Sequence, residues 1–425
     1  GLLIALRCSG SRLRRLDLRG VRAKAGPLPG LWDALSSARH LESLDVSGCK
    51  EISLEGSAAA LASLAQSLRH LNIAGCDSLH LALPSLLGSN LRHLRAGWLS
   101  EFDDDRVWDQ WIGVFPPNMF QTICRQAPGL VTLRVPGYAR LGSRTTQQEV
   151  PRIVKEIQEI STVASLQNLR RLDLSCAQLP GQFGDGVVTA IVRGCGRLRS
   201  INLRACSELT DGSLHAITQH LAEVLVHINI SCCQFSDRVV RHLVSRCRRL
   251  KTLDLCYCSR LGKPFLQFLC SDVALAPDLR MLGVGGLDAG DDEVEQLCRK
   301  YSATLAHLGI GSAKRLTDRG LQHLSRLPKL RKLSAHQLAS ISCAGLLNFL
   351  ERSPGLAHID VDGCVYSPPA HSDEEFFKLS EALDERRYSY DDSDQETDAE
   401  TESSAPAQEP LSGWAHLASA ATESS

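Results

Sequence analysis

Leucines recur along this chain at a fixed spacing of apolar and polar positions. The pattern Leu-x-x-Leu-x-Leu-x-x-Cys, in which x is any residue, occurs in thirteen copies, and ten of the twelve intervals between them are 23 to 29 residues long. The copies begin at Leu13, Leu41, Leu68, Leu91, Leu130, Leu169, Leu198, Leu225, Leu250, Leu279, Leu305, Leu330 and Leu356. Intervals of this regularity predict a stacked repeat array. Positions within the pattern are numbered one to nine below.

Each copy predicts a short strand, a turn and a helix. In "LKTLDLCYC", Leu253 and Leu255 alternate with Asp254, so the leucines face inward and the aspartate faces outward. Helix starts follow in "LTDGSLHAI", "FSDRVVRHL" and "LTDRGLQHL", where Ser or Thr precedes Asp and an apolar run of period 3.6. One unit cannot bury its apolar face alone, so the units must stack. Parallel strands then line a concave face, and helices line the convex one.

Two intervals of 39 residues indicate insertions, at about 99–118 and 139–160. The first concentrates aromatic residues, and the second predicts a loop leading into an amphipathic helix. The repeat array is expected at 1–366, a short helical or linker segment at 367–386, and a disordered, acidic, Ser/Thr-rich tail at 387–425. The opening residues resemble the second half of a repeat. We therefore expect a fragment or a processed product whose array begins in mid-repeat.

Sixteen cysteines raise the question of metal, redox or disulfide chemistry, most visibly at the adjacent Cys232 and Cys233. Position nine is occupied by cysteine in six copies and by Val, Leu or Ala in most others, which indicates a small apolar core position. These six are Cys49, Cys76, Cys206, Cys233, Cys258 and Cys364. Cys195 and Cys247 recur near the end of the helix, at a second such position. Cys232 and Cys256 are expected to face the concave side.

Spacing argues against a metal centre, since the chain has no paired C-x-x-C and no Cys/His set at zinc-finger spacing. Many unpaired thiols are typical of the cytosol or the nucleus. No cofactor is expected either. Catalysis has no candidate: the histidines recur beside strand starts, and "GVGGLDAGDDE" lacks a phosphate-binding glycine motif. No run of 18 apolar residues predicts a membrane span.

Charge is distributed unevenly, although the net charge is only -1. Residues 1–372 carry 44 basic and 33 acidic side chains, a net charge of about +11. Residues 373–402 carry 13 acidic and three basic side chains. Within this acidic segment Ser389, Ser393 and Thr397 each lie three residues before an acid, as in substrates of acid-directed kinases. The same pattern is equally typical of solvating disorder.

The full unit, best seen in "INISCCQFSDRVVRHLVSRCRRLKTLDLCYC", resembles the cysteine-containing leucine-rich repeat found mostly in F-box/leucine-rich repeat proteins. This resemblance covers about residues 1–366. It implies an α/β fold, a right-handed leucine-rich repeat solenoid or horseshoe of about 13 repeats. It also implies a non-catalytic substrate receptor, which captures a protein on its concave face. In that family an N-terminal F-box docks the arc on the Skp adaptor and cullin of an SCF ubiquitin ligase.

The residues of this chain contain no F-box, so docking on the Skp adaptor and cullin is expected only through a segment before residue 1. The alternative is an F-box-less scaffold or adaptor for protein–protein interaction, without a role in ubiquitin transfer. A regulator of a small GTPase is disfavoured by the cysteine-type repeat.

Partner-binding candidates lie at concave positions and in the first insertion. Arg95 and Arg134 interrupt a row of Asp and Asn at position five, beside the aromatic segment, and arginines with aromatics are the usual composition of a binding hot spot. The alternative is an insertion packed on its own repeats. The candidate set is Arg95, Trp98, Trp108, Trp111, Arg134, Arg204, Tyr257 and His336.

Basic residues also recur just before the strands and predict a ridge along one rim. Examples are Arg170, Arg199, Lys251, Lys329 and Arg331. The ridge is suited to acidic or phosphorylated segments, including the chain's own tail, or it is simply a solvated edge. Nucleic acid is not expected there, because no aromatic residues interleave with the basic ones to stack on bases.

Overall fold

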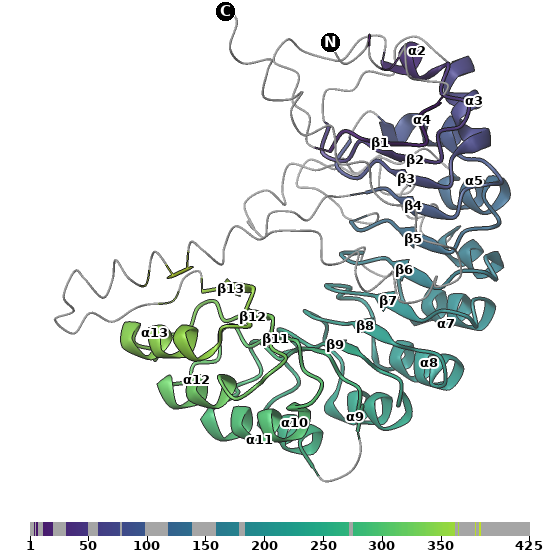
Figure 1. Ribbon diagram of the computed structural model, residues 1–425. Coiled ribbons are helices and arrows are strands. Elements are labelled where there is room, and N and C mark those ends of the chain that lie inside the picture. The colour runs from purple at the N-terminus through teal and green to yellow at the C-terminus, as the bar shows by residue number, and fades with distance from the viewer. Residues whose placement is uncertain are drawn as a thin grey trace, which may run out of the picture.

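The described residues build one curved, parallel β-sheet backed by helices (Figure 1). The structure is a computed structural model. It describes residues 4, 6, 12–19, 31–49, 58–76, 79–97, 118–137, 159–177, 183–271, 275–361, 364, 379 and 382–383. Figure 1 shows the strands along the inside of an arc and the helices along its outside. The predicted leucine-rich repeat solenoid is confirmed.

The sheet consists of thirteen strands within the described residues, and each pairs only with its neighbours in sequence. The strands are β1 (Arg15–Asp17), β2 (Ser43–Asp45), β3 (His70–Asn72), β4 (His93–Arg95), β5 (Thr132–Arg134), β6 (Arg171–Asp173), β7 (Ser200–Asn202), β8 (His227–Asn229), β9 (Thr252–Asp254), β10 (Met281–Gly283), β11 (His307–Gly309), β12 (Lys332–Ser334) and β13 (His358–Asp360). Pairing is in register, so Leu16 aligns with Leu44 and Leu333 with Ile359. Each pattern position therefore forms a row across the sheet.

The helices connect successive strands. They are α2 (Leu31–Leu35), α3 (Ala58–Ser67), α4 (Leu79–Leu86), α5 (Met119–Gln126), the 3-10 helix η3 (Glu159–Ser165), α7 (Asp185–Gly194), α8 (Asp211–Leu221), α9 (Asp237–Arg246), α10 (Lys263–Leu269), α11 (Asp291–Tyr301), α12 (Asp318–Leu324) and α13 (Cys343–Arg352). The 39-residue insertions lie mostly outside the described residues. Of the second, only residues 159 and 160 are described; they begin η3, and Ile160 is buried.

The core lies between the sheet and the helices and is built from the same pattern positions in every repeat. In one repeat, Leu250, Leu253 and Leu255 at positions one, four and six are fully buried. Burying a leucine side chain stabilises the fold by about 2 kcal/mol. Leu379 and Leu383 are also helical and buried against this core, so the chain remains attached to the array beyond β13.

Cysteine at position nine is more than a small apolar residue. All six thiols donate to the carbonyl oxygen of position six in the preceding repeat, over Sγ–O distances of 2.9 to 3.4 Å. Cys233, for example, donates to Leu203 and Cys258 to Ile230. Burial raises the pKa of both thiols to about 12. These cysteines therefore remain protonated donors that join neighbouring repeats.

The starts of neighbouring helices are also joined, again with the donor in the later repeat and the acceptor in the earlier one. Asp211, the first residue of α8, accepts from the backbone N–H of Ser236 at 2.8 Å and from its hydroxyl at 2.5 Å. Asp318 in α12 binds Ser342 in the same way, at 2.8 and 2.6 Å. Of the predicted Ser/Thr-Asp signals, Thr210 and Thr317 cap their helices by accepting from the N–H groups of Gly212 and Arg319, whereas the Ser236 side chain makes no such bond. Asp211 and Asp318 also fix the start of the next helix.

Position eight is a left-handed turn rather than a strand position. Its φ angle is between +55° and +75° at Gly48, Gly75, Gly137, Cys176, Ala205, Cys232, Tyr257, Gly286, Ser312 and Gln337. The N–H groups of these turns bind the next repeat, as from Cys232 to the carbonyl of Cys256 at 2.8 Å. Cys232, which was expected to face the concave side, forms this left-handed turn and is half-buried.

Replacing Cys233 by Ala is expected to lower the free energy of unfolding by about 1–2 kcal/mol, since it removes buried volume and the donor to Leu203. The midpoint of urea unfolding measures this. Cys232→Ala is the matched control, because Ala205 already occupies the same left-handed position, and its effect should stay within about 0.5 kcal/mol. Equal losses in both variants would contradict the role given to position nine.

Candidate functional site: the concave face

The concave row at position five has two kinds of residue. Most are Asp or Asn whose side chains accept from the backbone N–H of position seven in the same repeat, as Asp45 does from Ser47 at 2.9 Å and Asn229 from Ser231 at 3.0 Å. Asn229 also donates to Asp254 in the next strand, at 3.1 Å. These residues hold the turn after the strand. A site for a partner is therefore expected where the row is interrupted.

Arg95 and Arg134 form the first interruption. They are directly aligned on β4 and β5, and both side chains are half-buried. Within the described part of the chain, no hydrogen bond or ion pair joins either guanidinium to another group. Two adjacent like charges destabilise a strand pair, so a partner that supplies carboxylates there would relieve repulsion. The predicted companions Trp98, Trp108 and Trp111 lie outside the described residues.

The second interruption, at Gly283 and Gly309, lies between Tyr257 and His336, which belong to a hydrogen-bonded group. The Tyr257 hydroxyl lies 2.7 Å from Nε2 of His336 and 3.0 Å from Oγ of Ser312. Ser312 in turn donates to the side-chain carbonyl of Gln337 at 2.9 Å, and Nδ1 of His336 lies 3.7 Å from a carboxylate oxygen of Asp360. Tyr257 and His336 were predicted separately, and the structure brings them together across three repeats.

Glycines make this long contact possible. Positions five and seven are both Gly in the two intervening repeats, at Gly283 and Gly285 and at Gly309 and Gly311. A Cβ atom at Gly311 would lie 2.4 Å from Cε1 of His336. The Tyr257 ring lies against Gly286, where a Cβ would be 3.0 Å from Cδ1. The glycines thus leave a low floor on the concave face, with Tyr257 and His336 above it.

Tyr257 itself has an unfavourable backbone conformation. Its φ is +59°, a region that costs a bulky residue about 1–2 kcal/mol, and four other repeats have glycine there. The residue is nevertheless 40% exposed, and it is among the few large hydrophobic residues so exposed in the described chain. A strained, exposed aromatic residue at this point is better explained by binding than by stability.

Two other concave residues, Arg204 and Cys256, contribute less to the candidate site. Arg204 lies at position seven of its repeat, where its N–H donates to Asn202 at 3.0 Å, two repeats away from Tyr257. Cys256 borders the glycine floor, its Sγ 2.8 Å from where a Cβ on Gly283 would lie. Burial and the adjacent Asp254 carboxylate raise the pKa of this thiol. Cys256 is therefore a poor nucleophile.

Histidines at position three are structural. Nδ1 of His93 lies 3.0 Å from Thr132 Oγ1, and Nδ1 of His227 lies 2.8 Å from Thr252 Oγ1, each on the adjoining strand. Burial lowers the pKa of both imidazoles to about 4, with nearby basic groups adding to the effect. Among the residues that the structure describes, no group of three or more His, Cys, Asp or Glu is arranged to hold a metal ion. In that same part of the chain, no helix combines the length and apolarity needed to cross a membrane.

Sequence reasoning missed Ser312, Gln337 and the part played by Asp360. Ser312 and Gln337 lie in the left-handed turn, where a polar residue gave no signal. The glycines at positions five and seven of two successive repeats could have indicated this site. A repeat without side chains at these two positions leaves space on the concave face.

Comparison with known proteins agrees with this architecture. Residues 37–59 match the family Leucine Rich repeat. The "Antagonist of mitotic exit network protein 1" of Eremothecium gossypii is 28% identical over 220 residues, 51% of this chain and 50% of that protein. A Transport inhibitor response 1-like protein of Oryza sativa subsp. japonica is 33% identical over 159 residues, 36% of this chain and 25% of that protein.

The F-box protein SKIP1 of Arabidopsis thaliana is 25% identical over 171 residues, 40% of this chain and 52% of that protein. The yeast Rad7–Elc1 complex structure aligns with a TM-score of 0.47 at 18% identity, over 87% of this chain and 90% of that one. The chain spans about half or less of the curated relatives it matches. It is a leucine-rich repeat protein. Within that class it resembles the F-box/leucine-rich repeat receptors.

Lowering the pH from about 6.5 to about 4 is expected to lower the urea midpoint. In the unfolded chain His93 and His227 bind protons near their ordinary pKa of 6.5, whereas in the folded chain they do so only near 4. Their contribution to stability is therefore complete above pH 6.5 and is lost through this window. The double variant His93→Asn, His227→Asn should lose less stability between these pH values, while His215→Asn, at an exposed position on α8, should behave like the natural protein.

Proposed function

We propose that this chain is the substrate-recognition part of an SCF-type ubiquitin ligase and holds its protein substrate on the concave face. The observation that carries the proposal is the cysteine-type repeat itself. It recurs through the array, joins repeats through the position-nine thiols, and is the repeat type of F-box/leucine-rich repeat receptors. The partial match to an F-box protein supports the same class.

The proposed substrate site has two parts. The Tyr257–Ser312–His336 group offers an aromatic ring with hydrogen-bonding groups over a low glycine floor, which suits a protruding side chain or a turn of a bound protein. Arg95 and Arg134 offer positive charge in the N-terminal half of the arc, and Trp98, Trp108 and Trp111 remain candidate anchors beside them. Ubiquitin transfer itself is assigned to the recruited ligase. The chain has no proposed catalytic residue, metal or cofactor.

Docking on the ligase is proposed through a Skp adaptor and cullin, held by an F-box outside residues 1–425. The fifteen cysteines in the described part of the chain form no disulfide bond, which suits a reducing compartment, so we propose a cytoplasmic or nuclear location. The second candidate is a scaffold or adaptor without a link to ubiquitin. It is favoured by the fungal relative, whose name describes an antagonist of the mitotic exit network rather than an F-box protein.

Adaptor recruitment separates the two candidates. The complete protein, expressed with an affinity tag in its own cells, is expected to co-purify a Skp adaptor and a cullin, as quantified by mass spectrometry. If neither the Skp adaptor nor the cullin co-purifies while other proteins do, the scaffold is favoured.

Replacing Tyr257 by Gly separates binding from stability. The substitution removes the aromatic ring and relieves the left-handed strain, so the free energy of unfolding should change by no more than about 1 kcal/mol. The Skp adaptor should still co-purify, whereas at least one other protein should be lost and should accumulate in the cells. Ala205→Gly, at the same turn in another repeat, is the matched control. Unchanged partners in Tyr257→Gly would refute the concave site while leaving the ligase assignment intact.

A further inference from the structure

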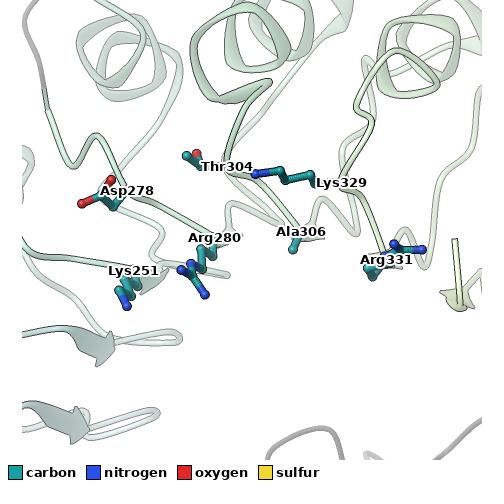
Figure 2. Close-up of a pocket in the computed structure, with 7 residues that line it drawn as sticks. All are labelled: Lys251, Asp278, Arg280, Thr304, Ala306, Lys329 and Arg331. Carbon is teal, nitrogen blue, oxygen red and sulfur yellow. The ribbon is translucent and has the colours of Figure 1, made fainter. Parts of the chain in front are cut away.

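A cavity of about 670 Å³ lies on the rim where the strands begin, away from the concave site (Figure 2). It extends over the four repeats that contain β9 to β12. Two short rows line it. Lys251, Arg280, Ala306 and Arg331 occupy position two, and Asp278, Thr304 and Lys329 each precede the first leucine of a repeat. We call this cavity the rim cleft.

The rim cleft has a fixed spacing because its position-two residues are consecutive in the sheet. Arg280 N–H donates to Lys251 O at 2.8 Å, Ala306 N–H to Arg280 O at 2.8 Å, and Arg331 N–H to Ala306 O at 2.7 Å. Neighbouring strands are about 4.8 Å apart, so Lys251 and Arg331 are separated by about 14 Å. An extended segment of about four residues covers that distance.

Two short side chains make the rim hollow at this point. Ala306 lies between Arg280 and Arg331 in one row, and Thr304 precedes Lys329 in the other (Figure 2). The hollow is therefore bordered by basic side chains in both rows.

Charge identifies the kind of ligand. Four of the seven lining residues are basic and one, Asp278, is acidic. Arg331 is held in place by donating to the carbonyl of Gly355 at 2.8 Å, which keeps its guanidinium at the rim. Lysine and arginine side chains arranged in this way bind carboxylates.

We propose that the rim cleft binds an acidic peptide segment, and that this segment is residues 391–402 of the chain itself. Those twelve residues carry seven carboxylates and no basic side chain, whereas residues 1–372 carry a net charge of about +11. The rim cleft lies near the C-terminal end of the array, since Arg331 contacts the connection to β13. The acidic segment begins eight residues after the buried Leu383.

Attachment to the same chain favours this occupant over a separate acidic protein. A tethered segment is present at an effective concentration of about millimolar, so even a weak electrostatic contact is formed much of the time. The contact is expected to weaken with salt, because the basic side chains lie at the surface. In the occupied state the tail covers one edge of the array and leaves the concave face open.

The test uses a fluorescent peptide of residues 388–404 and the full chain throughout. One protein is the natural chain, and a second has its tail carboxylates neutralised at Asp391→Asn, Asp392→Asn, Asp394→Asn, Glu396→Gln, Asp398→Asn, Glu400→Gln and Glu402→Gln. The neutralised chain should bind the peptide at least tenfold more tightly, because its rim cleft is vacant. Equal affinity for the two chains would refute occupation by the chain's own tail, and so would an absence of binding to both.

Further variants in the neutralised chain locate the site. Lys329→Glu with Arg331→Glu should abolish peptide binding, and Ala306→Leu should weaken it by filling the cavity while keeping all four basic residues. Arg170→Glu with Arg199→Glu is the matched control, since both are exposed at position two in other repeats. If this control weakens binding as much as the rim-cleft pair does, the peptide binds the basic array in general and the rim-cleft assignment is wrong. Unchanged urea midpoints show that the variants fold.

Discussion

Successive strands of this array pair in register, and each residue of the pattern therefore aligns with its counterpart in every other repeat. Parallel strands can pair this way only if every repeat presents a buried apolar residue at positions one, four and six. The main-chain hydrogen bonds and the burial of those apolar side chains reinforce one another. When the hydrogen bonds and the buried core are both formed, the surface residues lie in rows across the sheet. A change of residue type within a row then marks a place where the surface differs from that of the other repeats.

The two proposed binding sites are both interruptions of rows. On the concave face, Asp and Asn at position five are required by the turn that follows each strand, so replacing them with Arg or Gly releases that surface from a structural role. On the rim, Ala306 lies between Arg280 and Arg331 and leaves a hollow between these long basic side chains. In each case the repeat tolerates the change because its core positions are unaffected. An array of this kind can therefore acquire binding surfaces without altering its fold.

The sequence was sufficient to predict the repeat, the parallel strands and the helix starts, because periodic leucines and Ser/Thr-Asp pairs report local requirements that recur many times. It also placed Cys233 in the core, since Val, Leu or Ala fills the same position elsewhere. The donor role of that thiol was not predictable, as it depends on where the carbonyl of Leu203 lies in the preceding repeat. Tyr257 and His336 are 79 residues apart, and only the curvature and the intervening glycines bring them into contact. The left-handed turn at position eight was missed because Cys, Ala, Tyr, Ser and Gln obscure the preference for glycine.

The contacts made by Cys233 and by Ser236 have a direction. In both, the side chain belongs to the later repeat and its acceptor to the earlier one, and the same holds at Cys258 and Ser342. During synthesis the acceptor is therefore already in place when the donor leaves the ribosome. Each new repeat can complete its helix start and its cysteine contact on a surface that has already folded. Assembly from the N-terminal end would leave one incomplete repeat exposed at a time, which limits the unpaired strand edge available for aggregation during translation.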